Sequence, residues 1–187
     1  MRHINRLLRK IDFNAFHIVI QQHRIRKSGR PLWLGTGMEY IVAYPYNITK
    51  IEPAKYAFKQ AVQDGIVALS IEAGRLGTVQ AENVALVKNA VYNMLNYSGL
   101  YKTSETTIKT NRKYLQHQSY VRVPGKGLFY SLIKSGDSVS KDQNIGYITD
   151  DFGNILHQIT SPVSGIVLYK VGTPPVNTGE TLFCIAD

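Results

Sequence analysis

The chain has 187 residues, a hydrophobic fraction of 44% and a formal net charge of +9. This length fits one or two domains, because a domain usually holds about 100–200 residues. No apolar run approaches the roughly 20 residues that cross a bilayer, and no apolar stretch follows the basic N-terminus as in a secretory signal. A single cysteine, Cys184, excludes an internal disulfide framework. We therefore expect a soluble, cytoplasmic protein without a membrane partner.

Most of the positive charge lies in residues 1–30, which carry eight basic side chains and one acid, Asp12. A basic arm of this kind can bind phosphate backbones. The segment nevertheless lacks a nucleic-acid-binding signature, zinc-finger spacing and a regular basic face. We therefore expect no nucleic-acid partner, and we interpret residues 1–30 as an incomplete structural unit.

The first half of the chain alternates predicted strands and helices. A short helix is expected over residues 1–11, and apolar runs predict strands over 16–20 and 38–44. A basic, glycine-containing loop separates the strands. Pro45 ends the second strand because proline cannot donate to a sheet ladder.

Two helices with a strand between them follow. The first helix is predicted from Pro53 to Asp64, where proline suits the first helical position, and Gly65 ends it. The continuous apolar run 66–71 predicts a strand buried on both faces. The second helix is predicted over 79–97, with Thr78 as its N-cap. Its expected core-facing stripe consists of Val84, Val87, Val91, Met94 and Leu95.

Residues 124–148 and 162–185 are two copies of one unit. In each copy a proline is followed three residues later by a glycine, then by an apolar strand, a turn, a lone valine, a second turn and a last strand. The equivalent positions are Pro124 and Pro162, Gly127 and Gly165, and Val139 and Val176. Self-similar units usually cannot bury their apolar faces alone and pack on one another. We expect a small, closed, barrel-like sandwich.

Residues 123–186 resemble the barrel-sandwich fold of biotinyl and lipoyl carrier domains. Those carriers attach the cofactor to a lysine at the hairpin tip between the two halves. Here the tip reads DDFGN over residues 150–154, and no lysine occurs from residue 144 to residue 167. Because amide attachment needs a primary amine, we expect a tight turn rather than a cofactor-carrying site.

Glu72 is the strongest candidate for a catalytic residue. It stands at the end of the predicted buried strand, and a loop with Gly74 leads from it to the next helix. In open α/β sheets, ligands bind at the carboxyl ends of strands. A carboxylate shielded there can shuttle protons, although an acid before a glycine turn can equally cap a helix or pair with Arg75.

A strand that ends in Glu-x-Gly, followed by a helix, a linker and this β repeat, is similar to the succinylglutamate desuccinylase/aspartoacylase family. The resemblance covers residues 38–187 and implies a zinc-dependent amide hydrolase that releases amino acids from N-acyl amino acids. It implies an α/β zinc-peptidase-like sheet domain followed by an all-β barrel-sandwich domain. By this resemblance Glu72 is the general base, and Arg75 is our candidate for binding a substrate carboxylate.

The zinc ligands of the family are not all present. Its His-x-x-Glu motif is absent, because no histidine here has an acid three residues later. His23 follows a hydrophobic strand as the family's third ligand does, which makes it the candidate metal residue; a surface histidine in a basic loop is the alternative. Catalytic zinc normally needs three protein ligands. We therefore expect an incomplete hydrolase, inactive alone, with its catalytic fragment over 1–101.

The remaining boundaries place a linker over residues 102–119, which are polar and without periodicity, and the β domain over 120–187. A second functional class stays open. In this alternative the chain is a non-enzymatic module for assembly, because the exposed edges of its incomplete sheet favour association into a homo-oligomer.

Overall fold

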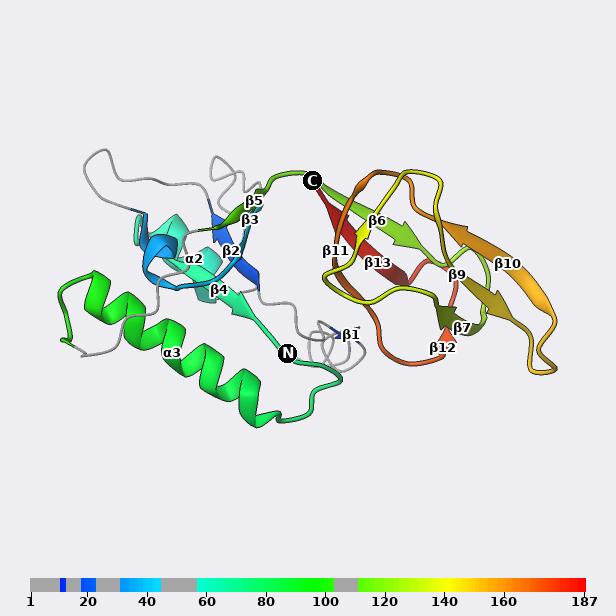
Figure 1. The fold of residues 1–187 in the computed structure, drawn as a ribbon, viewed down its shortest axis with the longest axis horizontal. Coiled ribbons are helices and arrows are strands. Elements are labelled where there is room, and N and C mark those ends of the chain that lie inside the picture. The colour runs from blue at the N-terminus through cyan, green and yellow to red at the C-terminus, as the bar shows by residue number, and fades with distance from the viewer. Residues whose placement is uncertain (1–10, 13–17, 23–30, 45–56, 103–110) are drawn as a thin grey trace. The chain divides into compact units, whose positions relative to one another are not determined.

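The computed structural model describes residues 11–12, 18–22, 31–44, 57–102 and 111–187. The described chain is mostly sheet with few helices, and it divides into two compact units. The α/β unit comprises residues 17–72 and 80–116, and the β unit comprises residues 1–16, 73–79 and 117–187. Figure 1 shows the elements of both units, coloured by residue number.

The α/β unit is built on a mixed four-stranded sheet with the order β4-β2-β3-β5. Its strands are β2 (Ile18–Gln22), β3 (Tyr40–Tyr44), β4 (Leu69–Glu72) and β5 (Lys113–Leu115). Strands β2, β3 and β5 are parallel, whereas β4 runs antiparallel to β2. The strands predicted over 16–20, 38–44 and 66–71 are confirmed as β2, β3 and β4 with shifted ends.

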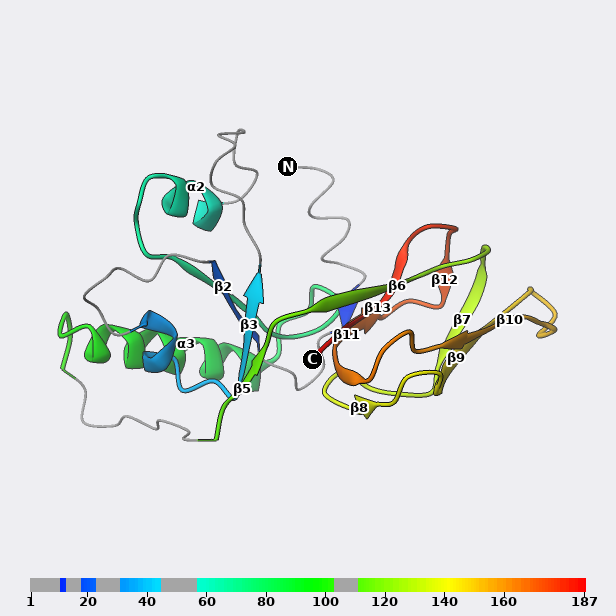
Figure 2. The same cartoon turned by 90° about the horizontal axis from the view of Figure 1, so that it is seen from above.

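The described residues of this unit form two α-helices, α2 (Ala57–Gln63) and α3 (Ala81–Tyr97), which lie on opposite sides of the sheet (Figure 2). A glycine with positive φ stands two residues after the end of each helix, Gly65 with φ 77°, as expected, and Gly99 with φ 72°. The short 3-10 helix η1 (Leu32–Gly35) packs on α3. No helix in the described ranges is long and apolar enough to span a membrane.

The core-facing stripe expected for α3 is partly wrong. The core of the α/β unit includes Ala90 with Met38 and Ile41, whereas Val84 and Val91 remain 54% and 40% exposed. The helix therefore packs with the face that contains Ala90. The two valines therefore lie on the flank of the helix.

Two further expectations for this region are corrected. Strand β4 is half-buried rather than buried on both faces, and Ile66 and Val67 before it are 61% and 43% exposed. Gln80, not Thr78, occupies the N-cap position of α3. The Thr78 hydroxyl donates to the carbonyl oxygen of Arg75 at 2.9 Å and so closes the turn before the helix.

Strand β5 lies within the range 102–119, where the sequence predicts a linker. It pairs in parallel with β3, and the Lys113 N–H donates to the Glu39 carbonyl oxygen at 2.8 Å. Part of that range is therefore a strand of the sheet. In the described sheet β5 lies at the edge, with β3 as its neighbour.

The β unit consists of two sheets that enclose one core. One sheet has the order β1-β11-β13-β6, with β8 paired to β11, and the other has the order β10-β9-β7-β12. Its strands are β1 (Ile11–Asp12), β6 (Gln118–Arg122), β7 (Gly127–Ser131), β8 (Ser138–Val139), β9 (Asn144–Thr149), β10 (Ile155–Thr160), β11 (Gly165–Val171), β12 (Pro175–Val176) and β13 (Thr181–Ala186).

The two sequence copies are interlocked by exchange of their short strands. In the first copy Gly127 pairs with Val176 of the second, and in the second copy Gly165 pairs with Val139 of the first. The long strands pair within each copy, β7 with β9 and β11 with β13. Each copy therefore completes the sheet of the other, which explains why the unit occurs twice.

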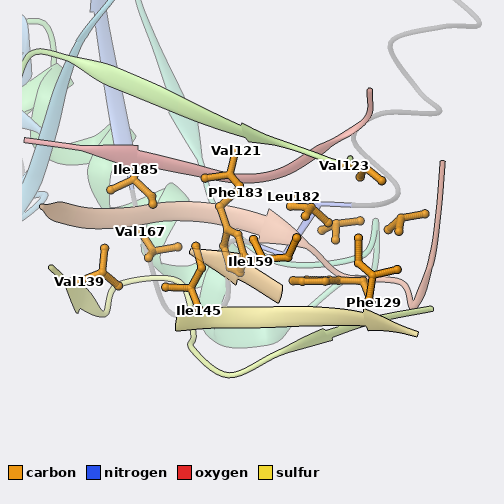
Figure 3. Packing of buried hydrophobic residues seen from close by; sticks show 13 residues of the cluster. Val121, Val123, Phe129, Val139, Ile145, Ile159, Val167, Leu182, Phe183 and Ile185 are labelled. Carbon is orange, nitrogen blue, oxygen red and sulfur yellow. The ribbon is translucent and has the colours of Figure 1, made fainter. Parts of the chain in front are cut away.

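The core between the two sheets contains thirteen buried hydrophobic residues, and Figure 3 shows side chains from both sheets pointing into this space. Phe183 is fully buried and meets Phe129 edge-on, with ring centroids 5.5 Å apart. Both sheets are open in the described chain, so the closed barrel that we expected is not observed. The arrangement is a sandwich of two open sheets.

Candidate functional site

Glu72 is the last residue of β4, as the sequence predicts for a functional carboxylate. Successive side chains of a strand point to opposite faces of the sheet. Leu69 and Ile71 pack against the core that contains Ala90 of α3. Ser70 and Glu72 therefore lie on the other face of β4, on the side of the sheet that carries α2 (Figure 2).

The Glu72 carboxylate is held by a neighbour on its own strand. The Ser70 hydroxyl donates a hydrogen bond to Glu72 Oε1 at 3.0 Å. Burial raises the pKa of Glu72 above its ordinary value, and the hydrogen bond from Ser70 lowers it to a smaller extent. A carboxyl group in this environment is easier to protonate than one in water, which suits proton transfer near neutral pH.

Arg75 lies three residues further on, in the short segment 73–79 that belongs to the β unit. Its side chain is exposed, and its carbonyl oxygen accepts hydrogen bonds from the N–H and the hydroxyl of Thr78, at 3.1 and 2.9 Å. The backbone between it and Glu72 turns at Gly74, where φ is 95°. A role of Arg75 in binding substrate stays a prediction.

His23, the candidate metal residue, lies outside the described residues. Glu72 is paired with Ile18 at the beginning of β2, whereas Gln21 is paired with Leu69 at the beginning of β4. The carboxyl end of β2, which leads toward His23 in the sequence, is therefore the end remote from Glu72.

The zinc ion that the family resemblance implies does not fit the residues described here. Among them, no group of three or more histidine, cysteine, aspartate or glutamate side chains is placed to hold a metal ion. A catalytic zinc site requires three protein ligands. The two described histidines belong to the β unit: His117 contacts Asp187 at 3.2 Å, and His157 packs against Gly125.

The sequence analysis did not single out Ser70. A signal was available, because residues i and i+2 of a strand share one face and serine is a strong hydrogen-bond donor. A serine two residues before a carboxylate on a strand is therefore placed where it can donate a hydrogen bond to that carboxylate. The spacing alone does not show whether the hydroxyl turns toward the carboxylate, and here it does.

Comparison with solved structures shows the fold. The product-bound ectoine utilization protein EutE (DoeB) from Ruegeria pomeroyi is similar, with a TM-score of 0.80 and 18% identity over 95% of this chain and 55% of that chain. A succinylglutamate desuccinylase/aspartoacylase from Rhodobacter sphaeroides has a TM-score of 0.75 and 20% identity, over 96% and 55% of the two chains. An aspartoacylase family protein from Mesorhizobium loti has a TM-score of 0.66 and 14% identity, over 96% and 54%.

These similarities confirm the resemblance to the fold of succinylglutamate desuccinylase/aspartoacylase family proteins. The chain spans about 55% of the length of the first of these structures. Neither a family model nor a curated protein sequence matches this chain. At this level of identity, the likeness concerns the fold and does not transfer an activity.

Proposed function

We propose that this chain carries the proton-transfer residue of a deacylase-type amide hydrolase, and that this residue is Glu72. The observation that carries the proposal is the half-buried carboxylate at the carboxyl end of β4, with one oxygen held by Ser70. The resemblance to succinylglutamate desuccinylase/aspartoacylase proteins, whose fold this chain shares, suggested this role for Glu72. The substrate class implied by the resemblance is an N-acyl amino acid.

In this proposal Glu72 acts as a general base and then as a general acid. Oε2 takes a proton from the water that attacks the amide carbonyl carbon, and the carboxyl group returns the proton to the amine nitrogen when the C–N bond breaks. A pKa raised by burial favours the second transfer. Because the described residues do not fit zinc, we assign no step to a metal ion.

Arg75 is proposed to bind the carboxylate of the amino-acid part of the substrate. A guanidinium group has donors in the planar fork that matches a carboxylate. The exposed side chain of Arg75 stands on the loop that follows β4. Replacement of Arg75 by lysine is expected to raise the KM for the substrate with a smaller change in kcat.

The β unit is proposed to be an accessory domain of the barrel-sandwich type without a bound cofactor. Two observations support this proposal. The strands β8 and β12 are exchanged between the two copies, and the hairpin tip contains no lysine to which a cofactor could be attached. The carboxylate of Asp150 accepts hydrogen bonds from the N–H groups of Phe152 and Asn154, both at 2.9 Å. The tip is therefore a tight turn closed by hydrogen bonds to Asp150, as expected for the sequence DDFGN.

An amidase assay tests the role of Glu72. The chain is assayed on a panel of N-acetyl and N-succinyl amino acids, alone and mixed with a separate segment that carries the His-x-x-Glu motif implied by the family resemblance. Because this chain lacks that motif, we expect no turnover alone and turnover in the mixture. Glu72→Gln should abolish the turnover of the mixture. Glu82→Gln, at an exposed acid in the first turn of α3, is the matched control and should retain it.

Three results would contradict either the proposed role of Glu72 or the expected inactivity of the chain alone. Equal turnover with Glu72→Gln and with the unaltered chain excludes Glu72 as the proton-transfer residue. Stoichiometric zinc together with Glu72-dependent turnover by the chain alone overturns the expected inactivity. No turnover in the mixture, with correctly folded chains, removes the support for an enzyme.

A non-enzymatic assembly module is the second candidate function. It is favoured by apolar side chains exposed on the α/β unit: Ile66, Val67 and Val84 are 61%, 43% and 54% exposed. Strand β4, which follows two of them, lies at the edge of the described sheet with β2 as its neighbour. Open strand edges beside apolar surface promote association with another chain.

Light scattering after size-exclusion chromatography separates the two candidates. An assembly module should form an oligomer that Ile66→Lys or Val84→Lys dissociates. Val79→Lys, at a position that is 87% exposed in the other unit, is the control and should leave the oligomer intact. A monomer that stays monomeric at high concentration contradicts the assembly function.

A further inference from the structure

We infer that Ser70 is a positioning residue that fixes the Glu72 carboxylate in one orientation. The inference rests on the proposed function of Glu72 and names the group that prepares Glu72 for it. It comes from one contact, the 3.0 Å hydrogen bond from the Ser70 hydroxyl to Glu72 Oε1, and from the place of both residues on one face of β4.

The geometry of a strand explains why Ser70 can hold Glu72. Residues two apart on a strand project from the same face, about 7 Å apart along the chain. The longer glutamate side chain bridges this separation by folding back along the strand, so its carboxylate lies beside the short serine side chain. One oxygen is then occupied by the serine donor, and Oε2 remains to exchange a proton.

The two residues of β2 that stand directly opposite this pair have no side-chain donor. In the antiparallel register Ile18 stands opposite Glu72 and Ile20 stands opposite Ser70, and neither side chain has a polar atom. The helix on that side of the sheet, α2, carries Lys59 and is followed by Asp64, which accepts a hydrogen bond from Gln60 at 3.0 Å. Ser70 is therefore the side-chain donor to Glu72 that the described structure shows.

A hydrogen bond to a carboxylate stabilises its charged form and is lost when serine is replaced by a residue without a donor. Removal of the hydroxyl should therefore raise the pKa of Glu72 further, in the same direction as burial. It should also release the carboxylate to other rotamers. A purely structural serine, which only fills space, would leave the pKa of Glu72 unchanged.

Three variants of the full chain separate these roles. Ser70→Ala removes the hydroxyl, and the pair Ser70→Val and Ser70→Thr have the same shape but differ by that hydroxyl. The readout is the pKa of the Glu72 carboxyl, followed by carbon-13 NMR and assigned by the signal that Glu72→Gln removes. Far-ultraviolet circular dichroism checks that each variant is folded.

We expect Ser70→Ala and Ser70→Val to raise the pKa of Glu72, and Ser70→Thr to restore the value of the unaltered chain. A pKa of Glu72 that is the same in the valine and threonine variants overturns the inference. This readout needs no turnover, so it is independent of the amidase assay. If Glu72 proves inactive while the pKa responds as expected, the proposed function fails and the positioning contact stands.

Discussion

Glu72 stands directly opposite Ile18 in the antiparallel pairing of β4 with β2. This pairing places the carboxyl end of β4 beside the beginning of β2. The carboxylate therefore has an apolar neighbour across the sheet, and the hydroxyl of Ser70 is its described partner. A charged group in such surroundings weakens the fold at neutral pH, which leads to the first prediction.

Glu72→Gln is expected to raise the melting temperature of the α/β unit at pH 7. The pKa of Glu72 is raised by burial above its value in the unfolded chain. Between the two pKa values the folded state holds more protons than the unfolded state, so stability rises as the pH falls through the folded pKa. The stabilisation by glutamine should therefore shrink toward pH 4, as calorimetry from pH 4 to pH 8 would show.

Glu82→Gln is the control for this pH dependence. Glu82 is exposed in the first turn of α3, where a negative charge interacts favourably with the helix N-terminus. Its loss should lower stability at pH 7 by about 0.3–1 kcal/mol. A lower melting temperature for both variants at pH 7 would show that the charge of Glu72 does not destabilise the fold.

Phe183→Ala is expected to destabilise the β unit by about 3–5 kcal/mol, because it leaves a cavity in the core and removes the contact with Phe129. Phe152→Ala is the matched control. Phe152 is 92% exposed at the tip of the β9–β10 hairpin, so its loss should change stability by less than about 0.5 kcal/mol. Urea unfolding followed by fluorescence compares them, and equal losses would contradict the assigned core.

Gly127→Ala and Gly165→Ala are expected to destabilise the β unit by similar amounts, about 1–3 kcal/mol each. A Cβ at Gly127 would overlap the carbonyl oxygen of Thr149, and a Cβ at Gly165 would overlap that of Ala186. Thr149 and Ala186, to which these two oxygens belong, are the last residues of β9 and β13, the final strand of each copy. Thermal unfolding measures the effect, with Ser138→Ala at an exposed position of β8 as control. A large effect at one glycine alone would contradict the symmetry of the copies.

Cys184 is expected to resist thiol reagents at pH 8 while the chain is folded. Burial raises the pKa of its thiol to about 12, so little reactive thiolate is present. Ellman's reagent should label it slowly in buffer and completely in guanidinium chloride. Rapid labelling of the folded chain would show that the β13 strand opens or that the residue is not buried.

Local patterns predicted much of the β unit. The proline, glycine and valine positions of the two copies imply the same order of strands, and the structure confirms β7, β8 and β9 in one copy and β11, β12 and β13 in the other. The position of Glu72 at the end of a strand likewise follows from a local pattern, the apolar run 66–71. Each of these features depends on residues that are close in the sequence.

The face on which α3 packs was predicted only in part. The apolar stripe of the sequence includes Val84 and Val91, but the helix rests on the face that contains Ala90. Hydrophobicity favours large side chains as core residues, whereas the fully buried residue of α3 in this core is the small Ala90. That choice depends on the shape of the opposing surface, which the helix sequence does not contain.

The sequence by itself determined that Glu72 ends a strand and that the β repeat has no lysine at its tip. Only the tertiary structure decided that β4 runs antiparallel to β2 and that β8 and β12 are exchanged between the copies. The physical reason is the distance along the sequence over which each effect acts. Periodicity and turn chemistry depend on residues that are a few positions apart. Strand partners are chosen by the burial of both faces against segments far away in the chain.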